Sequence, residues 1–313
     1  MQDELSQLGA ATAAWGDRFG DTHLLPLTLA LLLHLASLVV RAGVWRGILA
    51  AAFPGRRVPM RSALLAYLAG IGANVVAPFR GGDVVRVVAI RRELGGASVT
   101  TIVSTLVAET VFGAVVVAVM VFAAAGLGWL PPIVHLPDAG AFEISFTAGH
   151  ALLAAGAGVI VAGVGLAAAE WANRHVRGFC QRVMAGLRIL RSPGRFARVV
   201  AAPQLFDWML RVGTAYALLA AFGLTATLRY AVLAVVIDSI STALPFTPGG
   251  IGAQQGLLVF ALAGAAGTPQ VMAYSIGAQA VILAFNLLLG VIAVFLFFGQ
   301  VRLGAFREAH APG

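Results

Sequence analysis

The sequence contains no lysine, a single cysteine and few charges of either sign. Only 11% of its 313 residues are charged, whereas a soluble domain has about 25%. The lone Cys180 excludes an internal disulfide and a cysteine-rich metal site. All 21 basic residues are arginine. A GC-rich genome would explain this usage without any functional role, although arginine also suits anionic lipid headgroups.

Apolar residues make up 60% of the chain, and the mean hydropathy is +0.91. These values predict an integral membrane protein, and the apolar runs are too many and too long to be a signal peptide. The net charge of +8 points to the membrane surface. No basic patch is interleaved with aromatics and no extramembrane segment is large enough to read bases, so we expect no nucleic-acid partner.

Hydropathy divides the chain into two membrane halves. We expect an N-terminal segment at 1–22, half 1 at 23–170, an Arg-rich connector at 171–200, half 2 at 201–300 and a tail at 301–313. Apolar runs long enough to cross a bilayer lie at about 23–41, 98–123, 149–169, 204–223 and 270–298. Weaker or shorter apolar stretches lie at about 62–79, 230–244 and 253–266.

Two similar segments interrupt the apolar sequence, one in each half. They are Ala77-Pro78-Phe79-Arg80-Gly81-Gly82 and Leu244-Pro245-Phe246-Thr247-Pro248-Gly249-Gly250. Breaks at 77–83 and 244–252 would need protein or a watery cavity around them, and paired breaks in two halves point to a transporter-like binding site. The alternative is a chance likeness of turn residues. The hinge candidates are Pro78, Gly81, Gly82, Pro245, Pro248 and Gly252.

Basic segments set the expected topology, because cytoplasmic loops are rich in arginine. The segments 41–61, 80–92 and 174–198 should all be cytoplasmic. All three can be cytoplasmic if 59–96 enters the membrane from the cytoplasm and returns to the same side. Residues 230–267 would then enter from the outside and return to the outside. We therefore predict an all-α polytopic protein of the bacterial inner membrane, with five full spans and two re-entrant broken helices in an inverted repeat. Its N-terminus is outside and its C-terminus cytoplasmic. The alternative is seven ordinary spans, in which one loop lies on the side of the membrane that the charge rule does not predict.

Charged and polar residues near the breaks are the candidate site. An ionisable group at membrane depth usually has a function or is paired with another group. Glu109 and Asp238 are therefore candidates for residues that gate a polar path through the membrane. Asp207 and Arg211 are expected to pair along one helix face, and His34 to be a satisfied packing residue. The headgroup-binding candidates at the first break are Asn74, Arg80, Asp83 and Arg86. The alternative is that these residues form a solvated loop whose arginines only anchor it at the lipid headgroups.

The second break is uncharged and relies on backbone and amide groups. Consecutive glycines let backbone amides approach a ligand closely, and a helix that starts after Gly252 would direct its positive end at an anion. The candidates for headgroup binding there are Thr247, Gly249, Gly250, Gln254 and Gln255. Gln279 and Asn286 in the last span could hydrogen-bond across to them.

No enzyme signature is present. The chain lacks His-Glu-x-x-His, Gly-x-Ser-x-Gly and Walker patterns, and its six histidines are scattered. We therefore expect no catalytic residues, no metal, no cofactor and no self-contained ATP-driven pump.

The chain resembles the flippase-like membrane domain of lysylphosphatidylglycerol synthases and their stand-alone relatives. The resemblance rests on Arg41-Ala42-Gly43-Val44-Trp45-Arg46, Asn74 to Arg86, Glu109 and above all Leu244-Pro245-Phe246-Thr247-Pro248-Gly249-Gly250-Ile251-Gly252. It covers about 23–298. It implies a polytopic protein that moves, or helps to move, lipids or lipid-linked precursors between leaflets. No aminoacyl-transfer domain follows residue 298, so we expect no lysylphosphatidylglycerol synthesis by this chain.

Three departures from that family concern charge. A glutamate after the second break is replaced by Gln255, and an arginine in the last span by Gln279. Removing one partner of an ion pair would strand the other charge, so we hypothesise that Gln255 and Gln279 face each other as an uncharged pair. After Glu109 the family's charged run is also lost.

Together with the paired breaks, the resemblance implies a lipid flippase-like protein for an anionic, isoprenoid or hopanoid lipid or a lipid-linked precursor. Membrane lipids are the expected partners, and the sequence leaves the oligomeric state open. The alternative is a non-transporting scaffold that docks a lipid-biosynthetic enzyme through 171–200. A membrane-embedded enzyme would need a catalytic cluster that the sequence lacks.

Overall fold

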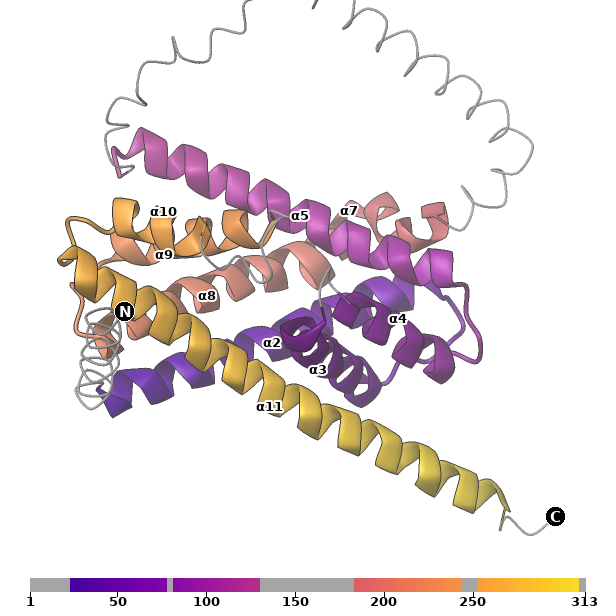
Figure 1. The fold of residues 1–313 in the computed structure, drawn as a ribbon. Helices are drawn as coiled ribbons and strands as arrows, with labels where there is room; N and C mark the ends of the chain where they lie inside the picture. The colour runs from indigo at the N-terminus through magenta and orange to yellow at the C-terminus, as the bar shows by residue number, and fades with distance from the viewer. Residues whose placement is uncertain (1–22, 78–80, 130–182, 244–252, 310–313) are drawn as a thin grey trace, which may run out of the picture.

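The computed structural model describes residues 23–77, 81–129, 183–243 and 253–309, and these residues contain helices and no strand (Figure 1). The first half comprises α2 (Leu24–Ala52), α3 (Met60–Val76), α4 (Gly81–Glu93) and α5 (Val99–Gly126). The second comprises η2 (Arg188–Arg191), α7 (Pro193–Phe196), η3 (Ala197–Ala201), α8 (Ala202–Ala221), α9 (Leu228–Ala243), α10 (Ala253–Ala261) and α11 (Thr268–Ala309). The all-α prediction is confirmed. The expected span at 149–169 lies outside the described residues.

Three of these helices are long and apolar enough to cross a bilayer. They are Leu24–Ala52, Val99–Gly126 and the Thr268–Phe297 part of α11, with hydropathies of 2.0, 2.4 and 2.8. Each exceeds the roughly 20 residues that span a hydrocarbon core. Their outer faces carry exposed leucine, valine and phenylalanine side chains, as expected for surfaces that contact lipid tails.

One predicted span end is wrong, and another helix continues beyond its apolar span. The first span was expected to stop at Arg41, but α2 continues to Ala52, because Arg41 meets charged and aromatic partners on neighbouring helices. The span in the last helix ends at Phe297, close to the expected residue 298, although α11 itself continues to Ala309. A helix of 42 residues is about 63 Å long, so it is longer than the bilayer core. A helix therefore does not have to end where its apolar sequence ends.

Both breaks coincide with the ends of helices. Helix α3 ends at Val76, and Ala77 is extended with φ −93° and ψ 127°, as expected for a residue that precedes proline. Helix α4 then begins at Gly81. In the second half α9 ends at Ala243 and α10 begins at Ala253. Residues 78–80 and 244–252 lie outside the described residues.

The helices of the first half recur in the second in the same order and at a nearly constant offset along the chain. Helix α3 begins at Met60 and α9 at Leu228, α4 ends at Glu93 and α10 at Ala261, and α5 begins at Val99 and α11 at Thr268. The helical stretch from Pro193 to Ala221, which includes a π-helical turn at Ala197–Ala201, corresponds to α2. This stretch begins inside the expected connector at 171–200.

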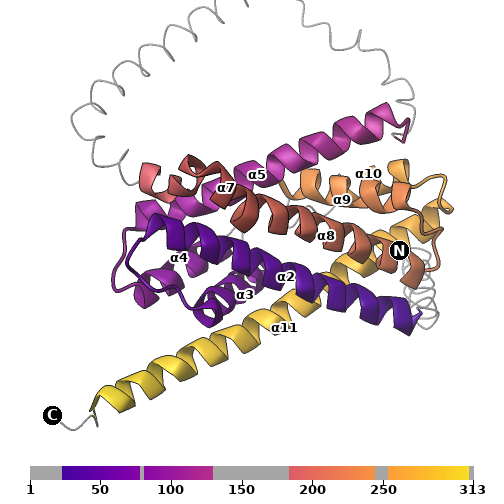
Figure 2. The ribbon, with the colours of Figure 1, turned by 180° about the vertical axis from the view of Figure 1, so that it is seen from behind.

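Equivalent helices run in opposite directions. The backbone N–H of His23 at the start of α2 donates to Ala221 O at the end of α8, 3.0 Å away, so α2 and α8 are antiparallel neighbours. Helices α5 and α11 also run in opposite directions (Figures 1 and 2). The packing is reciprocal as well, because α3 packs on α11 and α9 packs on α5. Among the described helices the arrangement has the pattern that an inverted repeat predicts.

Each half has its own apolar core. One is built around Trp45, Tyr67 and Ile90, and the other around Leu219, Leu262 and Val271. The halves join at α2–α8 and at the crossing of α3 with α11. At that crossing a Cβ atom on Gly72 would lie 2.5 Å from Gly290 Cα, so the two backbones are in contact, as small residues permit in membrane bundles.

Candidate functional site

A cluster of charged side chains lies inside the first half. We call Arg41, Tyr67, Asp83, Arg86 and Glu109 the first polar cluster. Arg86 Nη2 donates to Glu109 Oε2 at 2.9 Å, and Tyr67 Oη donates to Glu109 Oε1 at 3.2 Å. Arg86 Nη1 lies 3.3 Å from Asp83 Oδ1, and Arg41 Nη2 lies 3.8 Å from Glu109 Oε1. The cluster joins α2, α3, α4 and α5 through one carboxylate.

The Arg86–Glu109 pair is a buried ion pair. Each side chain is only 9% exposed. The Arg86 guanidinium lies 4.5 Å from the Trp45 ring centroid and 4.2 Å from that of Tyr67, which adds cation–π attraction. The sequence placed Glu109 within a membrane span and Arg86 beside the break, and the structure brings them together. Binding of a headgroup by Arg86 stays a prediction, and its guanidinium already has protein partners.

Asn74 and two glycines hold the first hairpin together. Asn74 Oδ1 accepts the backbone N–H of Gly82 at 2.8 Å, so the side chain satisfies one of the donors that the start of α4 leaves open. A Cβ on Gly70 would lie 2.8 Å from Gly82 O. The hinge candidate Gly82 therefore lies where α3 and α4 touch. Gly81 lies in the first turn of α4, where an added Cβ would come within 2.7 Å of Ala77 Cβ.

A second cluster occupies the corresponding place in the second half. We call Arg211, Asp238, Gln254, Gln255 and Gln279 the second polar cluster. Arg211 Nη2 donates to Asp238 Oδ2, and Gln254 Nε2 donates to Asp238 Oδ1, both at 3.4 Å. Gln279 Nε2 donates to Gln254 Oε1 at 3.2 Å, and Gln255 Nε2 donates to Gln279 Oε1 at 2.7 Å. The predicted uncharged pair of Gln255 and Gln279 is confirmed.

Polar contacts of α2 lie between the two clusters. His34 Nε2 and Asn286 Oδ1 are 2.8 Å apart, so His34 is a satisfied packing residue and Asn286 contacts α2 instead of the second cluster. Ser37 Oγ donates to Asp207 Oδ1. The predicted Asp207–Arg211 pair is wrong, because Asp207 faces α2 while Arg211 reaches Asp238 on α9. Contacts between helices thus override the spacing along one helix.

The remaining predicted site residues lie outside the described part of the chain. Their roles in headgroup binding or as hinges stay predictions. They are Pro78, Arg80, Pro245, Thr247, Pro248, Gly249, Gly250 and Gly252.

Sequence reasoning missed three residues of the clusters. Arg41 was assigned to a cytoplasmic basic segment, Arg211 to a structural pair, and Tyr67 was not considered. Arg41 and Arg211 share a signal that could have revealed them, because each lies in the first long helix of its half. Their separation along the chain is also close to that of the two Gly-Gly pairs.

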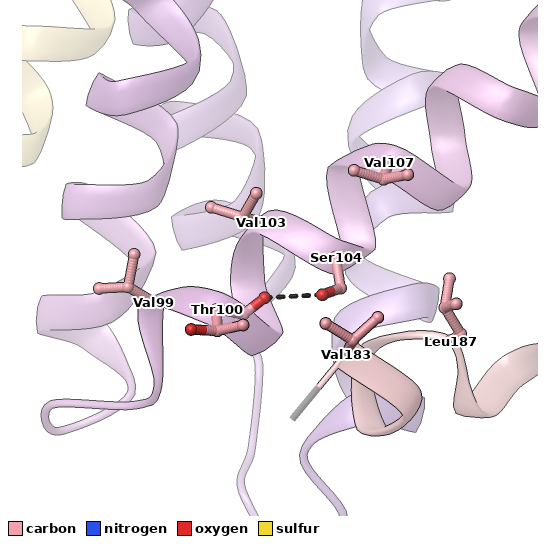
Figure 3. A pocket seen from close by; sticks show the side chains of 7 residues that line it. All are labelled: Val99, Thr100, Val103, Ser104, Val107, Val183 and Leu187. Atoms are coloured by element: carbon pink, nitrogen blue, oxygen red, sulfur yellow. Dashed lines mark hydrogen bonds between the residues drawn. The ribbon is translucent and has the colours of Figure 1, made fainter. Parts of the chain in front are cut away.

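A surface hollow of about 350 Å³ lies between α5 and residues 183–187 (Figure 3). It is lined by Val99, Thr100, Val103, Ser104, Val107, Val183 and Leu187. The Ser104 hydroxyl already donates to Thr100 O at 2.7 Å, so the hollow is a less suitable polar site than the clusters. Among the described residues no group of His, Cys, Asp and Glu could hold a metal ion.

The fold and the clusters define a polytopic α-helical membrane protein with ionised groups buried in its bundle. The family model for the lysylphosphatidylglycerol synthase TM region matches residues 9–290. The chain therefore belongs to this family, and the resemblance found in the sequence is confirmed. Comparison with curated proteins and with solved structures gave no match.

Proposed function

We propose that this protein moves an anionic, isoprenoid or hopanoid lipid, or a lipid-linked precursor, between the leaflets of a bacterial inner membrane. One observation carries the proposal: each half holds a polar cluster beside an interrupted pair of helices, in a bundle whose long helices expose apolar side chains. Ionisable groups are costly at membrane depth and mark transport pathways. Membership of a lipid-related membrane family supports the same function.

In this proposal the two breaks form a polar path for a headgroup near the membrane midplane. Arg80 and the glycine backbone at Gly249 and Gly250 hold the headgroup, while Glu109 and Asp238 adjust or gate the path. Rocking of one half against the other alternates access to the two leaflets. The N-terminus is outside and the C-terminus is cytoplasmic. Transport of this kind requires no catalytic residue and no cofactor.

Reconstitution tests the function directly. The full chain is placed in liposomes with fluorescent phosphatidylglycerol or a fluorescent polyprenyl phosphate, and leaflet exchange is followed by dithionite quenching. Wild type should accelerate exchange, and Arg80→Ala and Gly250→Leu should each lose most of the acceleration. Gly113→Ala is the matched control, since no atom lies within 4 Å of the added methyl group. Equal exchange in empty liposomes and in wild-type liposomes would overturn the proposal.

A second candidate is a non-transporting scaffold for a lipid-biosynthetic enzyme. Exposed arginines favour it: the described part of the chain carries them near the end of α2, in the loop before α3, at the start of α3, at the end of α4 and along 188–198. They are Arg46, Arg56, Arg57, Arg61, Arg91, Arg92, Arg188, Arg195 and Arg198. A pull-down with and without substitutions of Arg188, Arg195 and Arg198 tests it. Leaflet exchange by the purified chain alone would contradict a purely scaffolding role.

A further inference from the structure

Two arginines within the bundle have donor groups that no described residue occupies. Arg41 makes no hydrogen bond to a described residue; its nearest carboxylate oxygen, Glu109 Oε1, is 3.8 Å away, beyond hydrogen-bonding distance. Arg211 uses only Nη2 toward the described residues, and this atom lies 3.4 Å from both Asp238 Oδ2 and Ser239 Oγ. A guanidinium has five N–H donors. Within the described part of the chain, most donors of both arginines are therefore available to a ligand.

Each of the two guanidinium groups lies against an aromatic ring and is partly exposed. The Arg41 side chain is 34% exposed and stacks at 5.5 Å from the Tyr67 ring centroid. The Arg211 side chain is 24% exposed and lies 4.2 Å from the Trp208 ring centroid. Arg86 differs from them, because it is 9% exposed and bonded to Glu109 and Asp83. Arg41 and Arg211 thus have the fixed orientation and open edge that an anion site needs.

The two arginines are equivalent positions of the repeat. Arg41 lies in α2 and Arg211 in α8, and the offset between them equals that between Ser37 and Asp207, which contact each other. Glu109 and Gln279 are related by the same offset, and Arg86 and Gln254 by nearly the same one. The ion pair of the first half thus corresponds to amides in the second, whereas the position of Arg41 carries an arginine in both halves.

The contact between α2 and α8 places the two arginines on opposite sides of one point. Ser37 bonds to Asp207 there. Arg41 follows Ser37 by one helical turn and Arg211 follows Asp207 by one turn, and the two helices are antiparallel. Each arginine is therefore about 6 Å from that contact along the bundle, in opposite directions. The separation along the axis is about 12 Å, so a headgroup crossing the bundle would meet them in turn.

We propose that Arg41 and Arg211 are two binding positions for the oxyanion of a lipid headgroup, a phosphate or a carboxylate, one on each side of the Ser37–Asp207 contact. The planar fork of arginine binds such oxyanions through two hydrogen bonds. The nearby carboxylates leave room for the ligand, because Glu109 is bonded to Arg86 and Tyr67, and Asp207 to Ser37. This inference rests on the proposed lipid function.

Lipid binding to the full chain in detergent tests the two positions. The probe is fluorescent phosphatidylglycerol, with diacylglycerol, which has no oxyanion, as the comparison lipid and inorganic phosphate as a competitor. Arg41→Gln and Arg211→Gln should each weaken phosphatidylglycerol binding about tenfold, the equivalent of about 1.4 kcal/mol. Arg41→Lys, which keeps the charge and loses the fork, should lie between wild type and Arg41→Gln.

The control removes the same charge outside the bundle. Arg57 is exposed in the loop between α2 and α3, so Arg57→Gln should bind as wild type does. Thermal melting of every variant in the same detergent shows whether the fold is kept. If melting is unchanged and both Gln variants bind phosphatidylglycerol as wild type does, the inference is wrong. Wild-type binding that does not distinguish the two lipids would also overturn it.

Two further outcomes assign the ligand and separate this inference from the proposed function. Complete competition by millimolar inorganic phosphate would show a site for the free anion and would overturn the lipid assignment. Leaflet exchange is measured on the same variants. Binding that depends on Arg41 and Arg211 without exchange by wild type would support the binding positions and contradict the transport function. Exchange by wild type together with unchanged binding and exchange in both Gln variants would support transport and overturn the binding positions.

Discussion

At the scale of single residues, the two halves differ in how they fill their polar clusters. The first half keeps a buried charged pair, Arg86 and Glu109, while the second has the amides Gln255 and Gln279. Burying two charges costs several kcal/mol per ion unless geometry and extra hydrogen bonds compensate. Tyr67 and the cation–π contacts supply that compensation in the first half. Amides carry no charge to desolvate, so the Gln255–Gln279 pair needs no equivalent support.

The first prediction concerns the Arg86–Glu109 pair. Glu109→Gln leaves Arg86 without its main partner and should lower the free energy of unfolding by about 3–5 kcal/mol. The double change Arg86→Met with Glu109→Leu should be less destabilised than either single change, because neither charge is then stranded. Thermal melting in detergent measures Glu109→Gln, the double variant and its two single changes. Asp83→Asn is the control, since Asp83 is 34% exposed, and equal losses for the single and double changes would contradict the prediction.

The second prediction exchanges amides for charges in the second cluster. Gln255→Glu and Gln279→Arg should each destabilise the protein, since each puts one unpaired charge into a half-buried contact. Combined, the two changes should recover a large part of the loss, because the side chains already meet at 2.7 Å. Melting temperatures of the four proteins form a double-mutant cycle. A double variant no better than the sum of its singles would show that no new pair forms.

At the scale of helices, the elements are held as much by backbone contact as by apolar pattern. Helix α11 crosses α3 where Gly72 meets Gly290, and α4 meets α3 where Gly82 meets Gly70. Sequence patterns assigned no special role to these glycines apart from the hinge candidate Gly82. Both crossings involve α3, so this helix links the broken hairpin of the first half to the last helix of the second.

The third prediction tests the α3–α11 crossing. Gly72→Ala adds a methyl group 2.5 Å from Gly290 Cα and 3.1 Å from Asn286 O, so the helices must move apart at a cost of about 1–3 kcal/mol. Gly113→Ala in α5 is the matched control. Its methyl group meets nothing within 4 Å, so the gain in helix propensity should leave stability unchanged or higher. Comparable melting of the two variants would show that the crossing is not tightly packed.

At the scale of the whole molecule, the two halves are related by an inverted arrangement of their described helices. Helix bounds recur at a nearly constant offset along the chain, and α2 and α8 run antiparallel. The loop after α2 and the loop after α8 also match, because Gly55 and Gly223 both have positive φ, 89° and 70°. If the repeat is inverted across the membrane, these equivalent loops lie on opposite faces.

The fourth prediction follows from these loops. In a Cys180→Ser background, Arg57→Cys follows α2 and Thr225→Cys follows α8, and both positions are exposed. A membrane-impermeant maleimide should label Thr225→Cys from outside intact cells, and Arg57→Cys only after the membrane is opened. Labelling of both from the same side would contradict the inverted topology and favour seven ordinary spans.

Local properties of the chain were enough to predict the membrane class, the helical fold, the family and the place of both breaks. Hydropathy, the positions of Pro and Gly, and residue spacing are all readable without a fold. The Gln255–Gln279 pair was also predictable, because the loss of an acid and a base together suggested that they had been partners. Prediction failed for Asp207, Arg211 and Arg41, whose roles depend on which neighbouring helix they face.

Packing between helices sets the partners of these three residues. The spacing of Asp207 and Arg211 allows a pair on one helix, yet Asp207 bonds Ser37 on α2 and Arg211 reaches Asp238 on α9. Arg41 marked the expected end of a span, but Glu109 and Tyr67 on other helices keep it inside one. The cost of a charge in the membrane depends on what surrounds it in three dimensions, and the linear sequence does not specify that environment.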